Sequence, residues 1–162
     1  MKERPNIKLS NINTNVMKRY FTALNHLVNT YNNYTIRLMT VNNGVAPPAQ
    51  NGPNMRLIRK NNKAELVLHR KNNGVIIAWG NTKANFREQK LGTKIRALAA
   101  LAAINAKVPL YQESISPYSR RIMNKLGAHK NNNYSSNRYR KLSPNKANRN
   151  KISSLLKNSN PS

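Results

Sequence analysis

A pair of short apolar segments joined by a Lys-Asn-Asn-Gly turn limits the fold of this chain more than any other feature. Residues 65–70 and 75–79 are rich in Val, Ile and Leu, and the turn between them ends in Asn73-Gly74. Asn-Gly between two apolar runs favours a tight hairpin turn. The sequence therefore predicts two antiparallel strands at the centre of the fold.

The residues around this hairpin predict a layered α/β arrangement. Residues 55–59 alternate loosely and predict a strand before the hairpin. After it, residues 92–104 are rich in alanine and leucine, which favours a helix that packs closely on a sheet. Residues 108–111 predict a parallel strand, and residues 116–126 predict a second helix that Gly127 is placed to end. This order predicts an α/β fold, in which a small mixed sheet is covered by two helices.

The N-terminal third has a different character. Apolar residues recur every three or four positions from Val16 to Tyr31, so residues 10–31 predict a helix that docks on a neighbour or on its own domain. Residues 34–40 predict a short strand. Residues 42–54 carry Asn-Asn-Gly, Pro-Pro and Asn-Gly-Pro sequences, which are typical of a linker.

The segment beyond His129 is dominated by Asn, Ser, Lys and Arg. Leu142, Ile152 and the neighbouring leucines are too sparse for a second core, so we expect a basic extended tail that orders on a polyanion. The chain is thus expected to contain an N-terminal extension at 1–53, an α/β domain at 54–129 and a basic RNA-binding tail at 130–162.

The charge of the chain indicates its partner. Its 162 residues include 29 Lys and Arg but only 4 acidic residues, all glutamates, for a formal net charge of +25. A compact protein with this imbalance repels itself. Phosphates neutralise such charge and release counterions, so the composition predicts a nucleic-acid partner, with a membrane surface as the other polyanion. No apolar run reaches the length of a membrane span.

The residues that most enzymes need are scarce or scattered. The chain has no Cys and no Asp, and His26, His69 and His129 share no metal-ligand spacing. Its glutamates stand singly, and no Gly-rich phosphate-binding motif is present. We therefore expect a protein that is not an enzyme, with no catalytic residue, no metal site and no cofactor.

The stretch from Phe86 to Thr93 is the most informative for binding. It lies between a predicted strand end and a predicted helix start, where free backbone N–H groups and the helix dipole attract phosphates. We expect basic side chains here, along the second helix and in the tail to contact RNA. They are Arg59, Lys60, Lys83, Arg87, Lys90, Lys94, Arg120, Arg121, Lys125, Arg138, Arg140, Lys141, Lys146, Arg149 and Lys151.

The same segment resembles a known family. Asn61-Asn62, the turn at Asn73-Gly74 and the strand at 75–79 resemble the strand pattern of the small-subunit ribosomal protein eleven family, a platform protein of the ribosome. Further positions at the family's spacing are Phe86, Arg87, Lys90, Thr93, Ala97, Arg120-Arg121-Ile122 and Leu126-Gly127, with a weaker match at Ser143-Pro144-Asn145. The resemblance covers a little under half of the chain.

The chain also departs from the family pattern. Asn85 stands where a glycine flanks the phenylalanine, and Lys94 stands where a proline is expected. Residues 114–119 replace a glycine-rich helix opening, and the residues before Asn54 have no counterpart in the family.

This resemblance implies a structural constituent of the ribosome that positions small-subunit rRNA during translation. Its partners would be small-subunit rRNA, neighbouring small-subunit ribosomal proteins and mRNA near the exit path. Two alternatives stay open. One is a protein like large-subunit ribosomal protein eighteen, and the other is a free organellar RNA-binding accessory factor.

The abundance of Asn and Lys indicates the genome of origin. Both residues have A-rich codons, so the composition favours an A+T-rich genome, most simply a mitochondrial one, while a nuclear or bacterial A+T-rich genome would give the same bias. The first residues lack an Arg- and Ser-rich amphipathic presequence, which fits synthesis inside the organelle. We therefore expect a matrix location within the mitochondrial ribosome.

Overall fold

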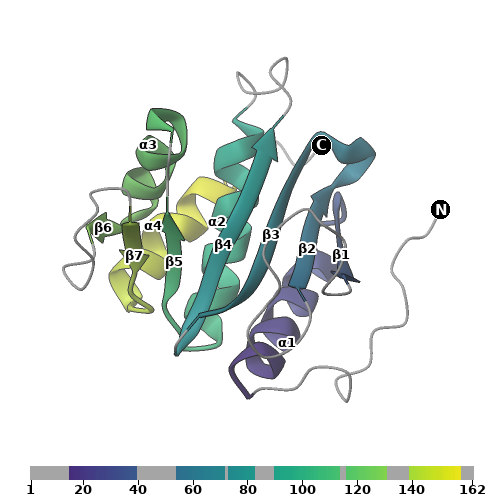
Figure 1. The fold of residues 1–162 in the computed structure, drawn as a ribbon, viewed down its shortest axis with the longest axis horizontal. Coiled ribbons are helices and arrows are strands. Elements are labelled where there is room, and N and C mark those ends of the chain that lie inside the picture. The colour runs from purple at the N-terminus through teal and green to yellow at the C-terminus, as the bar shows by residue number, and fades with distance from the viewer. Residues whose placement is uncertain are drawn as a thin grey trace.

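The computed structural model describes residues 15–39, 54–71, 73–82, 90–113, 116–130 and 139–157. Within these ranges lie four α-helices and a seven-stranded mixed sheet (Figure 1). The predicted linker at 42–54, except for Asn54, and the candidate RNA contacts Lys83, Arg87 and Arg138 fall outside them.

The sheet is open and almost entirely antiparallel. Its order is β1-β2-β3-β4-β5-β7-β6, and only β4 and β5 run parallel. The strands are β1 Tyr34–Met39, β2 Asn54–Arg59, β3 Ala64–Lys71, β4 Gly74–Thr82, β5 Leu110–Glu113, β6 His129–Lys130 and β7 Tyr139–Leu142. The predicted hairpin is confirmed, since Lys71 faces Gly74 across the turn from β3 to β4.

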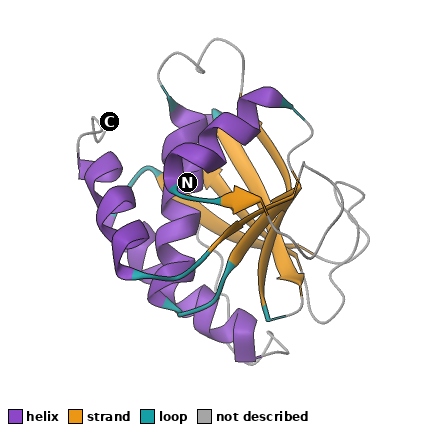
Figure 2. Ribbon diagram, turned by 90° about the vertical axis from the view of Figure 1, so that its left-hand side faces the viewer, coloured by secondary structure: helices purple, strands orange, loops and turns teal. Residues whose placement is uncertain are grey.

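The helices form a single layer on one face of this sheet, as Figure 2 shows. They are α1 Asn15–Thr30, α2 Leu91–Asn105, α3 Pro117–Leu126 and α4 Lys146–Lys157. A short 3-10 helix, η2 Lys60–Asn62, follows β2. The α/β class with a mixed sheet is confirmed, but the described sheet is larger than predicted, and four helices cover it where two were expected.

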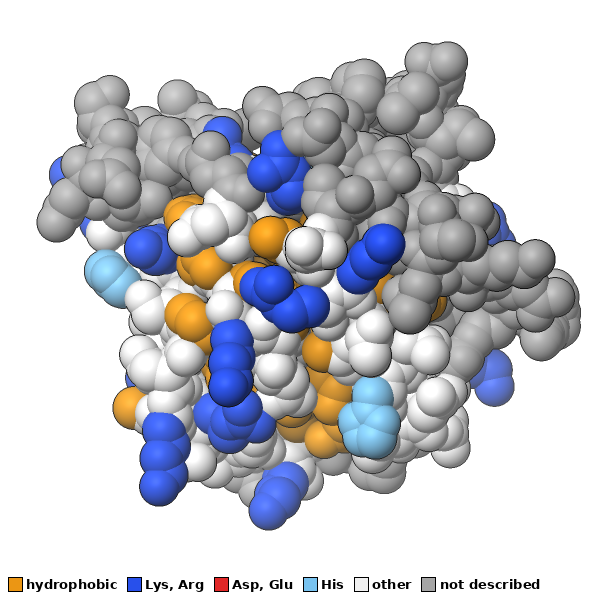
Figure 3. Space-filling view, turned by 90° about the horizontal axis from the view of Figure 1, so that it is seen from below, with side chains coloured by type: hydrophobic (Ala, Val, Ile, Leu, Met, Phe, Trp, Pro, Cys, Tyr) orange, Lys and Arg blue, Asp and Glu red, His pale blue; other side chains and the backbone are white. Residues whose placement is uncertain are grey.

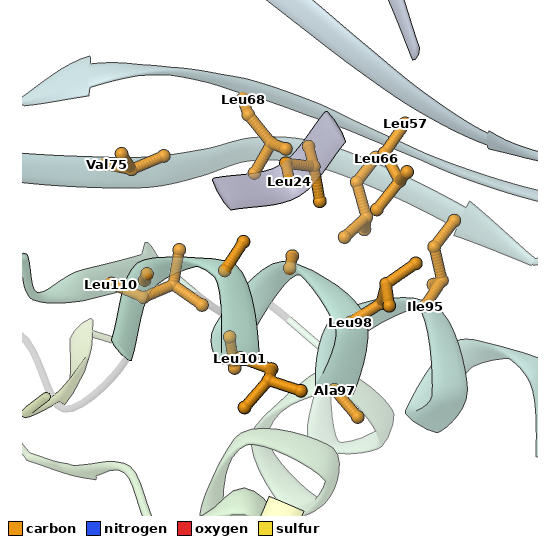
Figure 4. Packing of buried hydrophobic residues seen from close by; sticks show 14 of the residues in the cluster. Leu24, Leu57, Leu66, Leu68, Val75, Ile95, Ala97, Leu98, Leu101 and Leu110 are labelled. Atoms are coloured by element: carbon orange, nitrogen blue, oxygen red, sulfur yellow. The ribbon is translucent and has the colours of Figure 1, made fainter. Parts of the chain in front are cut away.

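The alanine-rich α2 is the centre of the core. All but two of its first fourteen residues are buried, because the helix lies between the sheet, α1 and α4. In Figure 4, Leu66 and Leu68 of β3 face α2, while Ala97 and Leu101 point away from the sheet. Small alanines on several sides of α2 permit this close packing on every flank.

The predicted second helix is confirmed at both of its ends. Ser116 caps α3, because its hydroxyl oxygen accepts a hydrogen bond from the Ser119 amide at 3.2 Å. Pro117 follows at the first position of the helix, where it needs no backbone partner. Gly127 ends the helix with a left-handed φ of 108°, a conformation that glycine adopts without a steric cost.

The N-terminal helix docks on its own molecule. Met17, Tyr20 and Leu24 of α1 are buried, and the Tyr20 hydroxyl donates a hydrogen bond to the Ala99 carbonyl at 3.0 Å. β1 extends the same sheet by pairing with β2. Residues 15–39 therefore share one apolar core with residues 54–129.

The prediction of an extended tail is wrong for residues 139–157. β7 pairs with β5, and α4 packs on α2. Leu142, Ile152 and Leu156 are sparse in the sequence, yet all three are buried in the shared core. These side chains do not need a second core, because they extend the first one, where α4 covers a side of α2.

Candidate nucleic-acid interface

One edge of the sheet gathers strand ends and helix starts. β2, β4 and β5 run in the same direction, so Arg59, Thr82 and Glu113 lie at this edge. α2 begins beside Thr82, and α3 begins at Pro117 after β5. We call this the upper edge, since it is at the top of Figure 1. In open α/β sheets, ligands bind beyond the carboxyl ends of parallel strands such as β4 and β5.

The first turns of α2 and α3 touch at the upper edge. A Cβ added to Gly92 would lie 2.3 Å from the Tyr118 hydroxyl oxygen and 3.0 Å from the Thr82 hydroxyl oxygen. The absence of a side chain at Gly92 therefore lets the two helix starts approach one another. Each helix start carries a partial positive charge that favours anions. Lys90 provides no side-chain cap for α2 and adopts a left-handed φ of 60°.

Four predicted cations lie at this edge. Lys60 and Lys90 are exposed. The Arg59 guanidinium sits over the Tyr34 ring, 5.5 Å from its centroid, and only 6% of Arg59 is exposed. Burial, and to a smaller extent the Arg59 charge, lower the pKa of Lys94. The structure thus places Arg59, Lys60, Lys90 and Lys94 along the same edge of the sheet.

One acidic side chain is described in the structure, and it pairs with an arginine outside this cluster. Glu65 is the only glutamate whose side chain is described there, and its Oε1 pairs with Arg56 Nη2 at 2.5 Å.

Arg96 is a site residue that the sequence analysis missed. It is 4% exposed; its Nε donates to Gln112 Oε1 at 3.2 Å, and its Nη1 donates to the Gly92 carbonyl at 3.3 Å. Gly80 leaves room for it, since a Cβ there would lie 2.8 Å from Arg96 Nη2. Burial lowers the pKa of Arg96 to about 10, so the side chain is still charged at neutral pH.

The buried charge of Arg96 adds to the positive charge of the upper edge. Arg96 holds the carbonyl of Gly92 at the start of α2, and its described partners are neutral oxygens. Its positive charge therefore adds to that of the helix start. The sequence does carry a signal, because Arg96 is the only charged residue between Ile95 and Ile104.

The other predicted contacts are more dispersed. Arg120, Arg121 and Lys125 lie on α3, and Arg140 of β7 donates from Nε to Asn124 Oδ1 at 2.9 Å. Lys141 pairs in register with Tyr111 and His129. Lys146, Arg149 and Lys151 lie on α4, where Arg149 binds Asn105 at the far end of α2. The α4 residues therefore do not join the upper-edge cluster.

The described ranges contain neither a metal-binding cluster nor a membrane-spanning helix. No group of three His, Cys, Asp or Glu side chains there could hold a metal ion. None of the described helices is long and apolar enough to cross a membrane.

Comparison with known proteins identifies no relative. No protein-family model matches the chain, and no curated protein or solved structure is significantly similar to it.

Proposed function

We propose that this chain is an RNA-binding structural protein of a ribonucleoprotein particle, and specifically a small-subunit ribosomal protein. The observation that carries the proposal is the upper edge, where Arg59, Lys60, Lys90 and Lys94 lie along the same edge of the sheet as two adjoining helix starts. A buried Arg96 lies beneath them. The net charge of +25 supports a polyphosphate partner for the chain as a whole.

The proposed mechanism is positioning without turnover. Lys and Arg side chains neutralise phosphates, and the amides at the start of α2 offer further donors. The spacing of these groups along the sheet edge selects RNA by the shape of its backbone, because side chains read base sequence poorly in A-form helices.

The assignment to the small subunit rests on the resemblance of residues 55–127 to the ribosomal protein eleven family. The three strands, the alanine-rich helix and the second helix that the resemblance implies correspond in position to β2, β3, β4, α2 and α3. The Asn- and Lys-rich composition favours a mitochondrial ribosome.

The RNA-binding proposal is tested by charge removal at the upper edge. The variant Lys60→Gln/Lys90→Gln/Lys94→Gln is compared with Arg37→Gln/Lys130→Gln/Lys157→Gln, which removes the same charge from exposed positions elsewhere. Binding to a short poly(A)·poly(U) duplex is measured over a range of salt concentrations. We expect the upper-edge variant to bind more weakly and to lower the salt slope by about one per lysine that contacts phosphate.

Equal weakening in both variants would show that only total charge matters, and the upper edge would lose its role. The particle itself is tested by sedimentation of native ribosomes. Migration with the large subunit would support a protein like large-subunit ribosomal protein eighteen, and a pool outside ribosomes would support a free accessory factor.

A further inference from the structure

A second basic site lies at the opposite end of α2. A groove of about 900 Å³ runs between α1 and the C-terminal end of α2. α1 contributes Lys18, Arg19, Thr22 and Ala23, and the end of α2 contributes Ala106 and Lys107. Figure 3 views the molecule from this lower side and shows Lys and Arg side chains around apolar atoms, with no described Asp or Glu in view.

One cation of this groove, Arg19, is held in place by a hydrogen bond across it. Arg19 Nε donates to the Ala106 carbonyl at 3.3 Å, just past the end of α2. Lys107 is exposed and has a left-handed φ of 61°, which directs the chain out of the helix. The C-terminal end of a helix carries partial negative charge, which stabilises cations gathered there. Three positive charges can therefore stand together without a carboxylate.

The shape of the groove favours a polyanion backbone over a protein helix. The large apolar residues of α1, such as Met17, Tyr20 and Leu24, face the core. The groove itself offers Ala23, Thr22 and Ala106, which give a partner's side chains little to anchor on. Among the described lining residues, His26 alone has a ring on which a base could stack, so recognition would rest mainly on the phosphates and would depend little on sequence.

We propose that this groove binds the sugar-phosphate backbone of a second RNA segment, so that the protein bridges two RNA segments. The inference rests on the proposed function, because the upper edge supplies the first contact. α2 has 15 residues and is therefore about 22 Å long. Cations at its two ends are too far apart to hold the same phosphates.

The test is a two-RNA capture assay. Immobilised poly(A)·poly(U) duplex is loaded with protein, and capture of a second, labelled duplex is measured. The groove variant is Lys18→Gln/Arg19→Gln/Lys107→Gln, and the control is Arg37→Gln/Lys130→Gln/Lys157→Gln. A second variant, Lys18→Glu/Lys107→Glu, keeps the hydrogen bond from Arg19 to Ala106 and so guards against loss of folding. We expect both groove variants to bind the first duplex and to lose capture of the second about tenfold or more, while the control bridges normally.

Each result decides a different question. No RNA binding by the unmodified protein would refute the proposed function. Binding of one duplex without capture of a second, or normal bridging by both groove variants, would overturn only the bridging inference. Cross-linking of α1 in the native particle to an acidic protein segment instead of RNA would overturn it as well.

Discussion

Single side chains determine how closely the helix starts at the upper edge can approach. Arg96 lies buried beneath the start of α2, and the glycines at 80 and 92 leave the space that it and Tyr118 occupy. Alanine in the interior of a helix is normally about 1 kcal/mol more stable than glycine. At Gly92 the contact with Tyr118 opposes that preference.

Gly92→Ala is therefore expected to destabilise the protein by about 1–3 kcal/mol, because the new Cβ forces Tyr118 away from α2. The measurement is urea unfolding of the single variant, of Tyr118→Phe and of the double variant. Tyr118→Phe removes the clashing oxygen, so the alanine should cost less in that background. Additive effects, or a stabilising Gly92→Ala, would mean that the two helix starts do not touch.

The lowered pKa of His69 predicts that the stability of the folded protein depends on pH. Burial is the main cause that lowers the pKa of His69, the Lys71 charge adds to this, and a hydrogen bond from Nδ1 to the Arg70 carbonyl opposes it. The unfolded chain then binds the proton at a higher pH than the folded protein. The free energy of unfolding should fall as the pH drops below the ordinary His value of about 6.5.

The check is chemical denaturation between about pH 8 and pH 5, across the window in which His titrates. His69→Gln should lose less stability over this range than the unmodified protein does. An identical loss in both proteins would assign the pH dependence to other groups.

Secondary-structure elements were predicted well where local signals exist. The turn at Asn73-Gly74, the cap at Ser116 and the stop at Gly127 each act within a few residues, and each is confirmed. α4 was missed because its evidence is not local. Ile152 and Leu156 are buried only because α2 has a flank of small side chains that they cover, and that flank exists only in three dimensions.

The same limit applied to the candidate site. The basic character of Lys90 and Lys94 could be read from the sequence, and so could their position at a helix start. The proximity of Arg59 to Lys94 could not be predicted from the sequence, because it depends on β2 and β4 running in the same direction. Neither could the groove between Arg19 and Lys107, whose two walls are distant in the sequence.

Docking of α4 predicts that Ile152→Ala costs about 2–5 kcal/mol, since Ile152 is completely buried. Lys151→Ala on the exposed side of the same helix is the matched control and should change stability by no more than about 0.5 kcal/mol. Thermal or urea unfolding measures both. An Ile152→Ala protein as stable as the parent would show that α4 does not pack on α2.

The whole molecule is dominated by like charge. A net charge of +25, with a single ion pair among the described side chains, destabilises the compact state through self-repulsion. Bound RNA phosphates or simple salt can relieve this repulsion. Salt, however, also weakens the binding of RNA.

The RNA-free protein should therefore melt at a higher temperature as NaCl increases from low concentration, because the screening length falls to about 10 Å at 0.1 M. Over the same range its affinity for RNA should fall. Thermal scans and binding isotherms in matched buffers measure the two trends. A melting temperature that does not rise with salt would contradict self-repulsion as the main destabilising effect.

The position of α2 between α1 and α4 has a consequence for the order of synthesis. A ribosome makes α1 first and α4 last, so the alanine-rich helix emerges with one flank ready to be covered and the other still bare. A nascent chain that ends before Lys146 would expose Ala97 and Leu101, and folding could finish only after the last helix has left the exit tunnel. A chain truncated before α4 would thus expose apolar surface and would not be a shortened but working protein.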